Sequence, residues 1–493
     1  MDRREALQLL AAGAIAASTG CSRREAAPSA ADLAALDCIA QADLAASGTV
    51  SPLELVEAAV ARVERLNPEL NAVTFADFER ALAAAPNARG PLAGVPYLIK
   101  DLNAYAGMPL TRGSRLFAEQ VSEAQSPFTD RIDNAGLVVL GKSNTPEFGL
   151  LPTTEPLLHG PTRNPWNLAH STGGSSGGAA AAVAARLVPA AQASDGGGSI
   201  RIPAAQCGLV GLKPSVGRFP DQGYGQQAWP ISIKHAVTRS VRDSALLLAL
   251  TERTEGGPLL PVGFTVRERL APQRIAVTVS SIYGDPDQSV AAAVERTAET
   301  LAALGHEIVV IETETPLHDP AFGDDFLTLW AAGAAGAVKL VEEKTGTPAS
   351  QTGLLEPATI ALGELMNARP ADALKRAVEG LGRYKASVDD FLSGYDAWLT
   401  PVTGSPAPEI GFLAPDLDYD TLMPRVQRFA AYTPTHNAAG TPAISIPAGL
   451  APSGLPVGVQ VATRIGGEAL LLQLAYQLEE AAPWADALPP LHA

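Results

Sequence analysis

Cysteine is scarce in this chain, and neither the cysteines nor the histidines form a recognisable ligand pattern. Three cysteines occur among 493 residues, at Cys21, Cys38 and Cys207. They are too few and too scattered for a disulfide framework or a thiolate metal site. The seven histidines show neither HExxH nor a similar spacing. We therefore predict no metal centre.

Positive charge and long hydrophobic runs are also in short supply. Lysine and arginine number 36 against 52 acidic residues, so the formal net charge is −16. Nothing in the chain resembles a basic stripe, which argues against a nucleic-acid partner. The apolar run at residues 9–17 is too short to remain in a bilayer as a helix. With 46% hydrophobic and 18% charged residues, the chain reads as a compact globular protein.

The first 31 residues differ from the rest. Arg3-Arg4 followed by Leu7 resembles a twin-arginine export signal, and the short apolar run fits its hydrophobic region. "STGC", ending at Cys21, resembles a lipoprotein cleavage box, although Ser18 stands where leucine is usual. We predict an export signal and tether over 1–31, with a periplasmic product. Whether Cys21 carries a lipid anchor is left open, and the alternative is an ordinary amphipathic helix.

The body of the chain alternates helix and strand patterns. Ser51, Pro52 and Glu54 predict a capped helix start. Apolar runs of strand length occur at 94–101 and 136–143, and residues 274–312 read as strand, helix, strand. This alternation predicts a layered α/β core. No linker divides the body, so we expect one large domain over 32–493.

Two familiar motifs occur in unfavourable surroundings. Residues 136–143 match the phosphate-binding pattern GxxxxGKS, but the intervening Leu-Val-Val-Leu looks like a strand rather than a loop. "GGSSGG" at 173–178 satisfies GxSxG, yet no apolar strand precedes it. The best histidine for a Ser–His–Asp site would be His436, which we interpret instead as a structural residue. Neither nucleotide binding nor a nucleophile elbow is favoured.

The stretch "SDGGGSIRIP", residues 194–203, needs an explanation. Three consecutive glycines suggest a backbone shape that side chains would prevent. One interpretation is a surface loop. The other is a group of backbone N–H donors around Ser199, placed to bind the negative oxygen of a substrate that Ser199 attacks.

A second serine loop lies close to the first in the expected fold. Helix from Gly177 to about Leu187 covers about 16 Å. The extended return from Val188 to Ser194 covers about 23 Å. The chain therefore runs out and comes back, which places Ser175 and Ser199 at the same end of the unit.

A serine hydroxyl also needs a group that takes its proton. No histidine lies near these loops in the sequence. Lys100 ends the apolar run "VPYLI", so a strand could deliver its amine to an interior edge, where desolvation would keep it neutral. The alternative is a surface lysine paired with Asp101.

The segment "GGSSGGAAAAVAARLVPAAQASDGGGSIRIPAAQCGLVGLKPS" resembles the diagnostic region of the amidase signature family. The resemblance extends from about Ser51 to Pro483 and includes "GVPYLIKD", "GKSNTPEF", "TRNPWN" and "NAAGTPAISIPAG". Within the family, "AGVPYLIKDL", "TTEP" and "RNPWNL" are most similar to 6-aminohexanoate-cyclic-dimer hydrolases. The resemblance implies an α/β/α sandwich around a mixed, mostly parallel central sheet. It also implies hydrolysis of a small-molecule amide without a cofactor, through an acyl-enzyme.

The family's residues carry over position by position. The resemblance implies that Ser199 is the nucleophile, that Ser175 follows a cis peptide and relays the proton, and that Lys100 is the base. The oxyanion donors would be the backbone of Gly196, Gly197, Gly198 and Ser199, and Gly149 would contact substrate. Asp195 and Arg201 would hold the loop, and Ser176 would support Ser175. Two departures are Gly196, where many members carry a larger residue, and "KHAVTRSVRD", which lacks a preceding Gly-Pro.

The substrate is the least determined feature. We expect residues 149–154, 222–229 and 326–330 to line the pocket, and their few charges predict neutral, fairly apolar, linear or cyclic amides. One alternative is a glutamine amidotransferase A-type subunit. Another is an exported binding lipoprotein that has lost activity. A homodimer is a further expectation, for which the sequence carries no specific signal.

Overall fold

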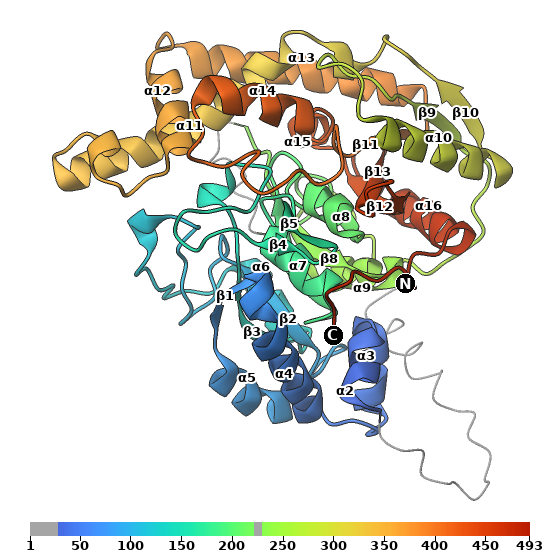
Figure 1. Cartoon of the computed structure of the whole chain (residues 1–493). Helices are drawn as coiled ribbons and strands as arrows, with labels where there is room; N and C mark the ends of the chain where they lie inside the picture. The colour runs from blue at the N-terminus through green and yellow to red at the C-terminus, as the bar shows by residue number, and fades with distance from the viewer. Residues whose placement is uncertain (1–27, 221–228) are drawn as a thin grey trace, which may run out of the picture.

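The structure is a computed structural model that describes residues 28–220 and 229–493 (Figure 1). The predicted export signal and Cys21 lie outside the described residues, as do 222–228 of one expected pocket segment. Among the described residues, no helix is both long and apolar enough to cross a membrane.

The core is an eight-stranded sheet in the order β10-β9-β11-β13-β12-β7-β8-β6. Its strands are β6 (Ala190–Asp195), β7 (Val210–Lys213), β8 (Ile233–Thr238), β9 (Arg274–Val277), β10 (Glu307–Val310), β11 (Ala397–Pro401), β12 (Ala443–Leu450) and β13 (Pro456–Ala462). Strand β9 is parallel to β10 and β11, whereas the other neighbours are antiparallel. The predicted mixed α/β sheet is confirmed, but the expectation that it is mostly parallel is wrong.

The antiparallel majority has a topological cause. Strands β6 and β7 run in the same direction and are joined through a helix, as an alternating pattern predicts. Strand β8 then returns between them and pairs antiparallel with both. Strands β12 and β13 follow each other directly and also pair antiparallel. Alternation along the sequence identifies strands and helices, but it does not say which strands become neighbours.

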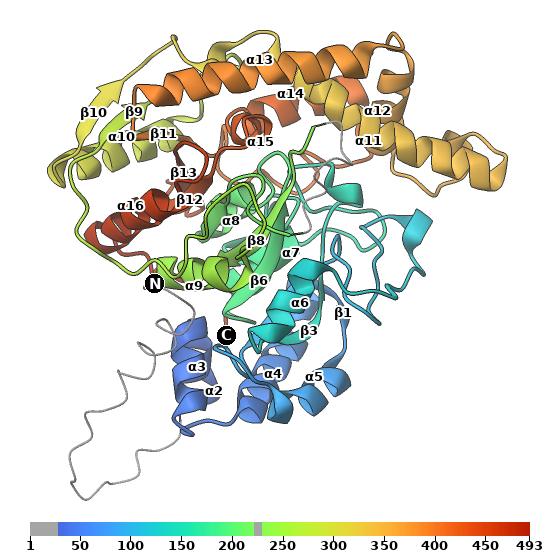
Figure 2. The same ribbon diagram turned by 180° about the vertical axis from the view of Figure 1, so that it is seen from behind.

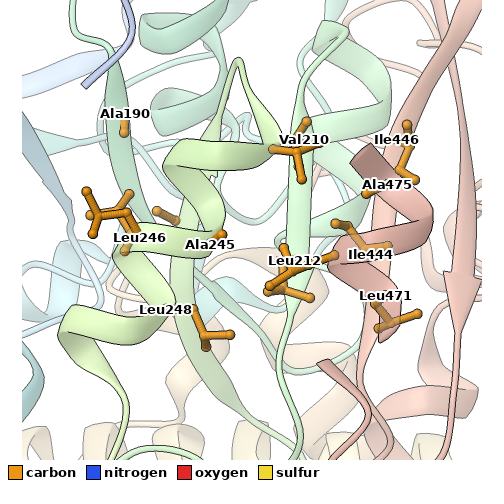
Figure 3. Close-up of a cluster of buried hydrophobic side chains, with 14 of the residues drawn as sticks. Ala190, Val210, Leu212, Ala245, Leu246, Leu248, Ile444, Ile446, Leu471 and Ala475 are labelled. Carbon is orange, nitrogen blue, oxygen red and sulfur yellow. The ribbon is translucent and has the colours of Figure 1, made fainter. Parts of the chain in front are cut away.

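Helices cover both faces of this sheet. Helices α9 (Val241–Thr251), α10 (Gln288–Ala303) and α16 (Glu468–Ala481) pack on one face, and α7 (Gly177–Ala184) and α8 (Arg201–Cys207) pack on the other. Successive side chains of a strand point to opposite faces. Accordingly Ala190 joins the apolar cluster of α9 and α16 (Figure 3), whereas Ala191 joins that of α7 and α8.

A smaller sheet, β1-β3-β2, lies next to the large one and carries Lys100. Its strands are β1 (Val73–Ala76), β2 (Pro96–Lys100) and β3 (Val138–Ser143), and its surroundings include α2 (Ala30–Ala35), α3 (Cys38–Ala46), α4 (Pro52–Leu70), α5 (Phe78–Ala84) and α6 (Pro127–Asn134). Helix α4 begins with the predicted capping box of Ser51 and Glu54. Residues 138–143 of the GxxxxGKS match form β3, which confirms that Val138, Val139 and Leu140 belong to a strand. Strand β2 lies beside β6, so the small sheet adjoins the end of the large one.

The opposite end of the molecule is helical (Figures 1 and 2). Helices α11 (Phe322–Thr345), α12 (Pro357–Asn367) and α13 (Ala373–Ser393) pack against one another there. The remaining elements are α14 (Tyr419–Phe429), α15 (Pro434–Ala438), the short pair β4 (Arg163–Asn164) and β5 (Asn167–Ser171), and the 3₁₀ turns η1 (Ala85–Asn87), η2 (Arg115–Phe117), η3 (Glu147–Gly149), η4 (Pro316–His318) and η5 (Ala349–Gln351). Helices α11 and α14 supply much of the wall of the site described below.

Candidate active site

Lys100 is the last residue of β2 and is fully buried. Its Nζ lies 2.8 Å from the Oγ of Ser175 and 2.8 Å from the Oγ of Ser176. A third hydroxyl, the Oγ of Ser194, lies 3.2 Å from the same nitrogen. Asp101 instead lies 3.7 Å from the Nζ of Lys142. The alternative of an exposed Lys100 paired with Asp101 is therefore wrong.

Burial has a direct electrostatic consequence for this lysine. Removal from water disfavours the ammonium form, so burial lowers the pKa of Lys100 well below its ordinary value. The negative charge of Asp195 acts in the opposite direction but is the weaker influence. A neutral amine at this position can accept a proton from a hydroxyl that contacts it.

Gln192 of β6 holds the backbone of Lys100 in place. Its buried Oε1 accepts from the Lys100 N–H at 3.0 Å and from the Asn103 Nδ2 at 2.7 Å. Its Nε2 donates to the Ala193 carbonyl at 2.9 Å. One side chain thus joins the end of β2 to β6, where the two sheets meet. Nothing in the sequence singled out Gln192, because its role depends on the two strands lying side by side.

Ser175 lies in a tightly packed glycine loop before α7. The Gly174–Ser175 peptide bond is cis, as predicted. A Cβ at Gly174 would lie 2.3 Å from the Thr153 carbonyl oxygen. A Cβ at Gly149, where φ is +71°, would lie 3.0 Å from the Ser175 Oγ. Both positions therefore require glycine, and Gly149 lies directly against the Ser175 hydroxyl.

Ser199 follows the glycine loop between β6 and α8 and is 7% exposed. Gly198 has a φ of +128°, and a Cβ there would lie 2.3 Å from the Thr433 Oγ1. Its N–H donates to the Asp195 Oδ1 at 2.7 Å. Within the described chain, the N–H groups of Gly196, Gly197 and Ser199 have no acceptor. Of the four predicted oxyanion donors, these three are free, whereas Gly198 shapes the loop.

Asp195 and Arg201 support this loop from behind, as expected. The Arg201 Nε lies 2.9 Å from the Asp195 Oδ2, and the Ile200 N–H donates to the same oxygen at 3.2 Å. Arg201 also donates to the Gln460 Oε1 at 2.9 Å and to the Asn437 Oδ1 at 2.7 Å. Burial alone would raise the pKa of Asp195, but the Arg201 guanidinium holds it well below its usual range. The carboxylate is thus a fixed acceptor for the loop.

Two pockets meet at Ser199. The first, here the α14 pocket, is lined by Gly149, Leu150, Leu151, Pro152, Gly197, Ser199, Ile202, Tyr283, Phe322, Gly323, Phe326, Leu327, Trp330, Met423, Val426, Gln427, Ala430, Ala431 and Pro434. The second, here the Ser175 pocket, is lined by Leu102, Phe148, Gly149, Leu150, Ser175, Ser194, Gly196, Ser199, Trp229, Ile231, Ser232, Leu329, Trp330, Ala332, Gly333 and Leu374. Among the described residues, no charged side chain lines either pocket.

The pocket segments expected from sequence are partly correct. Residues 149–152 line the pockets, but Thr153 and Thr154 are buried beneath them. Trp229 and most of 326–330 also contribute. Tyr283 and the α14 residues Met423 and Val426 were not expected, because they are remote from Ser199 in the sequence. No local pattern marks them, since Met423 and Val426 reach the serine through the packing of α14, and Tyr283 lies in the segment between β9 and α10.

His436 is buried and packed among structural neighbours. The His436 Nδ1 lies 3.0 Å from the Thr441 Oγ1, and its ring packs edge-on against Trp398. Burial lowers its pKa well below the ordinary value. The described residues contain no group of three or more His, Cys, Asp or Glu side chains suited to a metal ion.

Comparison with known proteins identifies the family. A family model described as Amidase matches residues 54–472. A putative amidase AmiC of Mycobacterium tuberculosis is 40% identical over 461 residues, covering 91% of this chain and 95% of its own. A 6-aminohexanoate-cyclic-dimer hydrolase of Pseudomonas is 37% identical over 477 residues, covering 92% and 96%.

Solved structures agree with the sequence comparison. A 6-aminohexanoate cyclic dimer hydrolase complexed with substrate has a TM-score of 0.87 and 35% identity, covering 93% of this chain and 100% of its own. A bacterial aryl acylamidase of the amidase signature family has a TM-score of 0.78 and 25% identity, covering 93% and 97%. The chain therefore belongs to the amidase signature family, whose relatives named here are hydrolases of amide C–N bonds.

Proposed function

We propose that the protein hydrolyses carboxylic amides with Ser199 as nucleophile and with Ser175 and Lys100 as its proton relay. The observation that carries the proposal is the buried Lys100 amine, 2.8 Å from the Ser175 Oγ and beside the glycine loop of Ser199. A serine needs such a base, and a desolvated lysine supplies one without a histidine.

The hydrogen bonds around Lys100 suit a neutral amine. Such a nitrogen donates two protons and has one lone pair. It can donate to the hydroxyls of Ser176 and Ser194 and accept the proton of Ser175. Ser175 in turn takes the proton of Ser199 as its Oγ bonds to the amide carbon. The N–H groups of Gly196, Gly197 and Ser199 are available to the negative oxygen that forms.

Each step of the reaction is balanced. The bond between the Ser199 Oγ and the carbonyl carbon forms, and the relay returns the proton to the nitrogen as the C–N bond breaks. The amine leaves and an ester remains on Ser199. Water then attacks the ester carbon, gives its proton to the same relay, and releases the carboxylic acid as the Ser199 Oγ recovers a proton.

The substrate class follows from the pocket walls. Both pockets are lined mainly by apolar and aromatic side chains, and the polar side chains among the described lining residues are uncharged. A charged substrate group would lose its hydration there without gaining an ion pair. We therefore propose neutral, fairly apolar amides. Free glutamine, the substrate of the amidotransferase alternative, carries an ammonium and a carboxylate, and no described residue of these walls has a charge that would pair with either group.

A labelling and hydrolysis experiment tests the proposal. A fluorophosphonate should label the wild-type protein and fail to label Ser199→Ala. Ser47→Ala, at an exposed serine remote from the pockets, should label like the wild type. Labelled protein should lose its hydrolysis of apolar amides. A wild-type protein that is neither labelled nor active on aryl, alkyl or cyclic amides would contradict the proposal, and faster hydrolysis of glutamine would favour the amidotransferase.

A further inference from the structure

Trp330 separates the α14 pocket from the Ser175 pocket. Among the residues that the structure describes, only Gly149, Leu150, Ser199 and Trp330 line both. The Trp330 Nε1 donates to the Leu150 carbonyl at 3.0 Å, which holds the ring between α11 and the Gly149 loop. Its outer edge would lie 3.5 Å from a Cβ at Gly196 and 3.6 Å from one at Gly197. The indole therefore lies over the glycine loop and occupies space next to the missing side chain at 196.

If Ser199 and Ser175 act as proposed above, the proton relay determines which pocket holds the amine side of the substrate and which holds the acyl side. The leaving nitrogen must receive its proton from Ser175. Ser175 lines only one of the two pockets. The nitrogen and its substituent must therefore point into the Ser175 pocket. The acyl group, on the other side of the attacked carbon, then points into the α14 pocket.

Both pockets offer apolar contact. The acyl side has a row of aromatic rings from α11, in which Phe326 and Trp330 stack with centroids 5.7 Å apart. The amine side has Leu102, Leu329 and Leu374 beside the Trp330 indole. A primary amide would release ammonia into this second pocket and leave these side chains without a partner. A substituted nitrogen would remove their apolar surface from water as the transition state forms.

We propose that the enzyme is selective for secondary amides with an apolar group on each side of the C–N bond. Trp330 sets this selectivity by dividing the acyl group from the amine substituent. The indole separates the two groups, so the length accepted on one side is independent of the length accepted on the other.

A substrate pair tests the selectivity directly. A primary amide and its N-butyl derivative share one acyl group and differ only on the amine side. We expect kcat/KM at least about tenfold higher for the N-butyl amide, because burial of several methylene groups contributes about that much or more. Equal or lower kcat/KM for the N-butyl amide would overturn the inference.

Two glycines of α11 provide a matched pair of variants. Gly333 lines the Ser175 pocket, and Gly336 lies about one turn further on, outside both pockets. A Cβ at either position would meet no atom within 4 Å, so a side chain can begin at both without a clash at its Cβ. Gly333→Leu projects a side chain into the mouth of the Ser175 pocket. Gly336→Leu introduces the same substitution into the same helix, at a position outside both pockets.

The expected results separate the two sides of the substrate. Gly333→Leu should lower the ratio of kcat/KM for the N-butyl amide over the primary amide at least about tenfold, and Gly336→Leu should leave the ratio unchanged. Val426→Phe, in the α14 pocket, should instead lower kcat/KM for long acyl groups at a constant amine. An unchanged ratio in Gly333→Leu would overturn the inference.

Failure of this inference differs from failure of the proposed function. If the wild-type enzyme is labelled at Ser199 and hydrolyses primary and N-butyl amides equally well, the proposed function stands and the proposed selectivity is wrong. A wild-type protein with no label and no amide hydrolysis loses both.

Discussion

At the scale of single residues, the proposed proton relay runs from Ser199 through Ser175 to Lys100, whose Nζ lies 2.8 Å from the Ser175 Oγ. Because the proton path is serial, loss of one member should disable the others. We expect Lys100→Ala and Ser199→Ala each to lower kcat by about 1,000-fold or more, and the double variant to be little worse. Ser175→Ala should keep more activity, since a water molecule can replace its hydroxyl. Steady-state kinetics on one apolar amide measures kcat for the three single variants and the double variant. Near-normal turnover in Lys100→Ala would contradict the proposal.

The pH dependence of the reaction follows from the burial of Lys100. Its pKa lies well below the ordinary value, and only the neutral amine can accept the proton of Ser175. As the pH falls through this lowered pKa, the amine gains a proton and activity should fall. Activity should recover fully when the pH is raised again within the range where the fold persists. The pH profile of kcat/KM measures this acid limb.

A second buried lysine serves as the control for that profile. Burial, together with the nearby Arg201, lowers the pKa of Lys213 to about 7, but its Nζ donates to the Pro214 carbonyl rather than to a serine of the site. Lys213→Met should therefore leave the midpoint of the acid limb in place. If the midpoint disappears in Lys213→Met, the acid limb reports the titration of Lys213 and not that of Lys100.

At the scale of elements, the site depends on how β2 is attached to β6. Gln192 alone accepts both the Lys100 N–H and the Asn103 amide. Gln192→Leu leaves these two buried donors unpartnered, which costs about 1–3 kcal/mol each. We expect kcat to fall about tenfold or more while KM changes little, because the lysine moves relative to Ser175 and the substrate walls do not.

A conservative variant distinguishes positioning from general destabilisation. Gln192→Glu keeps an acceptor for the Lys100 N–H and adds negative charge near the amine. It should recover much of kcat, and its acid limb should shift to higher pH, since an anion favours the protonated lysine. Equal losses of kcat in both variants, with no shift of the limb, would mean that Gln192 only stabilises the fold.

At the scale of the whole molecule, the N-terminal segment predicts where the protein works. Arg3-Arg4, the short apolar run and the following tether predict export, with Cys21 as a candidate lipid site. We expect the full-length chain to appear in the periplasmic or membrane fraction with its signal removed. Fractionation and mass spectrometry of the mature N-terminus measure both features. An unprocessed chain confined to the cytosol would contradict the prediction.

The placing of the two serine loops at the same end of one unit could be predicted from the sequence because it depends on local chain geometry. The glycine-flanked serines, the helix between them and the strand that ends at Lys100 are each written in a short segment. Helix α7 leads away from Ser175, and strand β6 returns over a comparable length to the loop of Ser199. The two serines therefore lie at the same end of this helix–strand unit. The glycines at 174 and 198 are required because the Thr153 carbonyl oxygen and the Thr433 Oγ1 lie 2.3 Å from where their Cβ atoms would be.

The sequence by itself thus determined the α/β class and the membership of a family of amide hydrolases, and it predicted Ser175, Ser199 and Lys100 as the reacting groups. Only the tertiary structure decided the strand order, the joining of β2 to β6 through Gln192, and the two pockets divided by Trp330. The physical reason is the separation along the sequence of the residues that interact. Helix and strand patterns reflect neighbours a few residues apart, whereas β8 between β6 and β7, or α14 over Ser199, results from packing of segments tens to hundreds of residues apart.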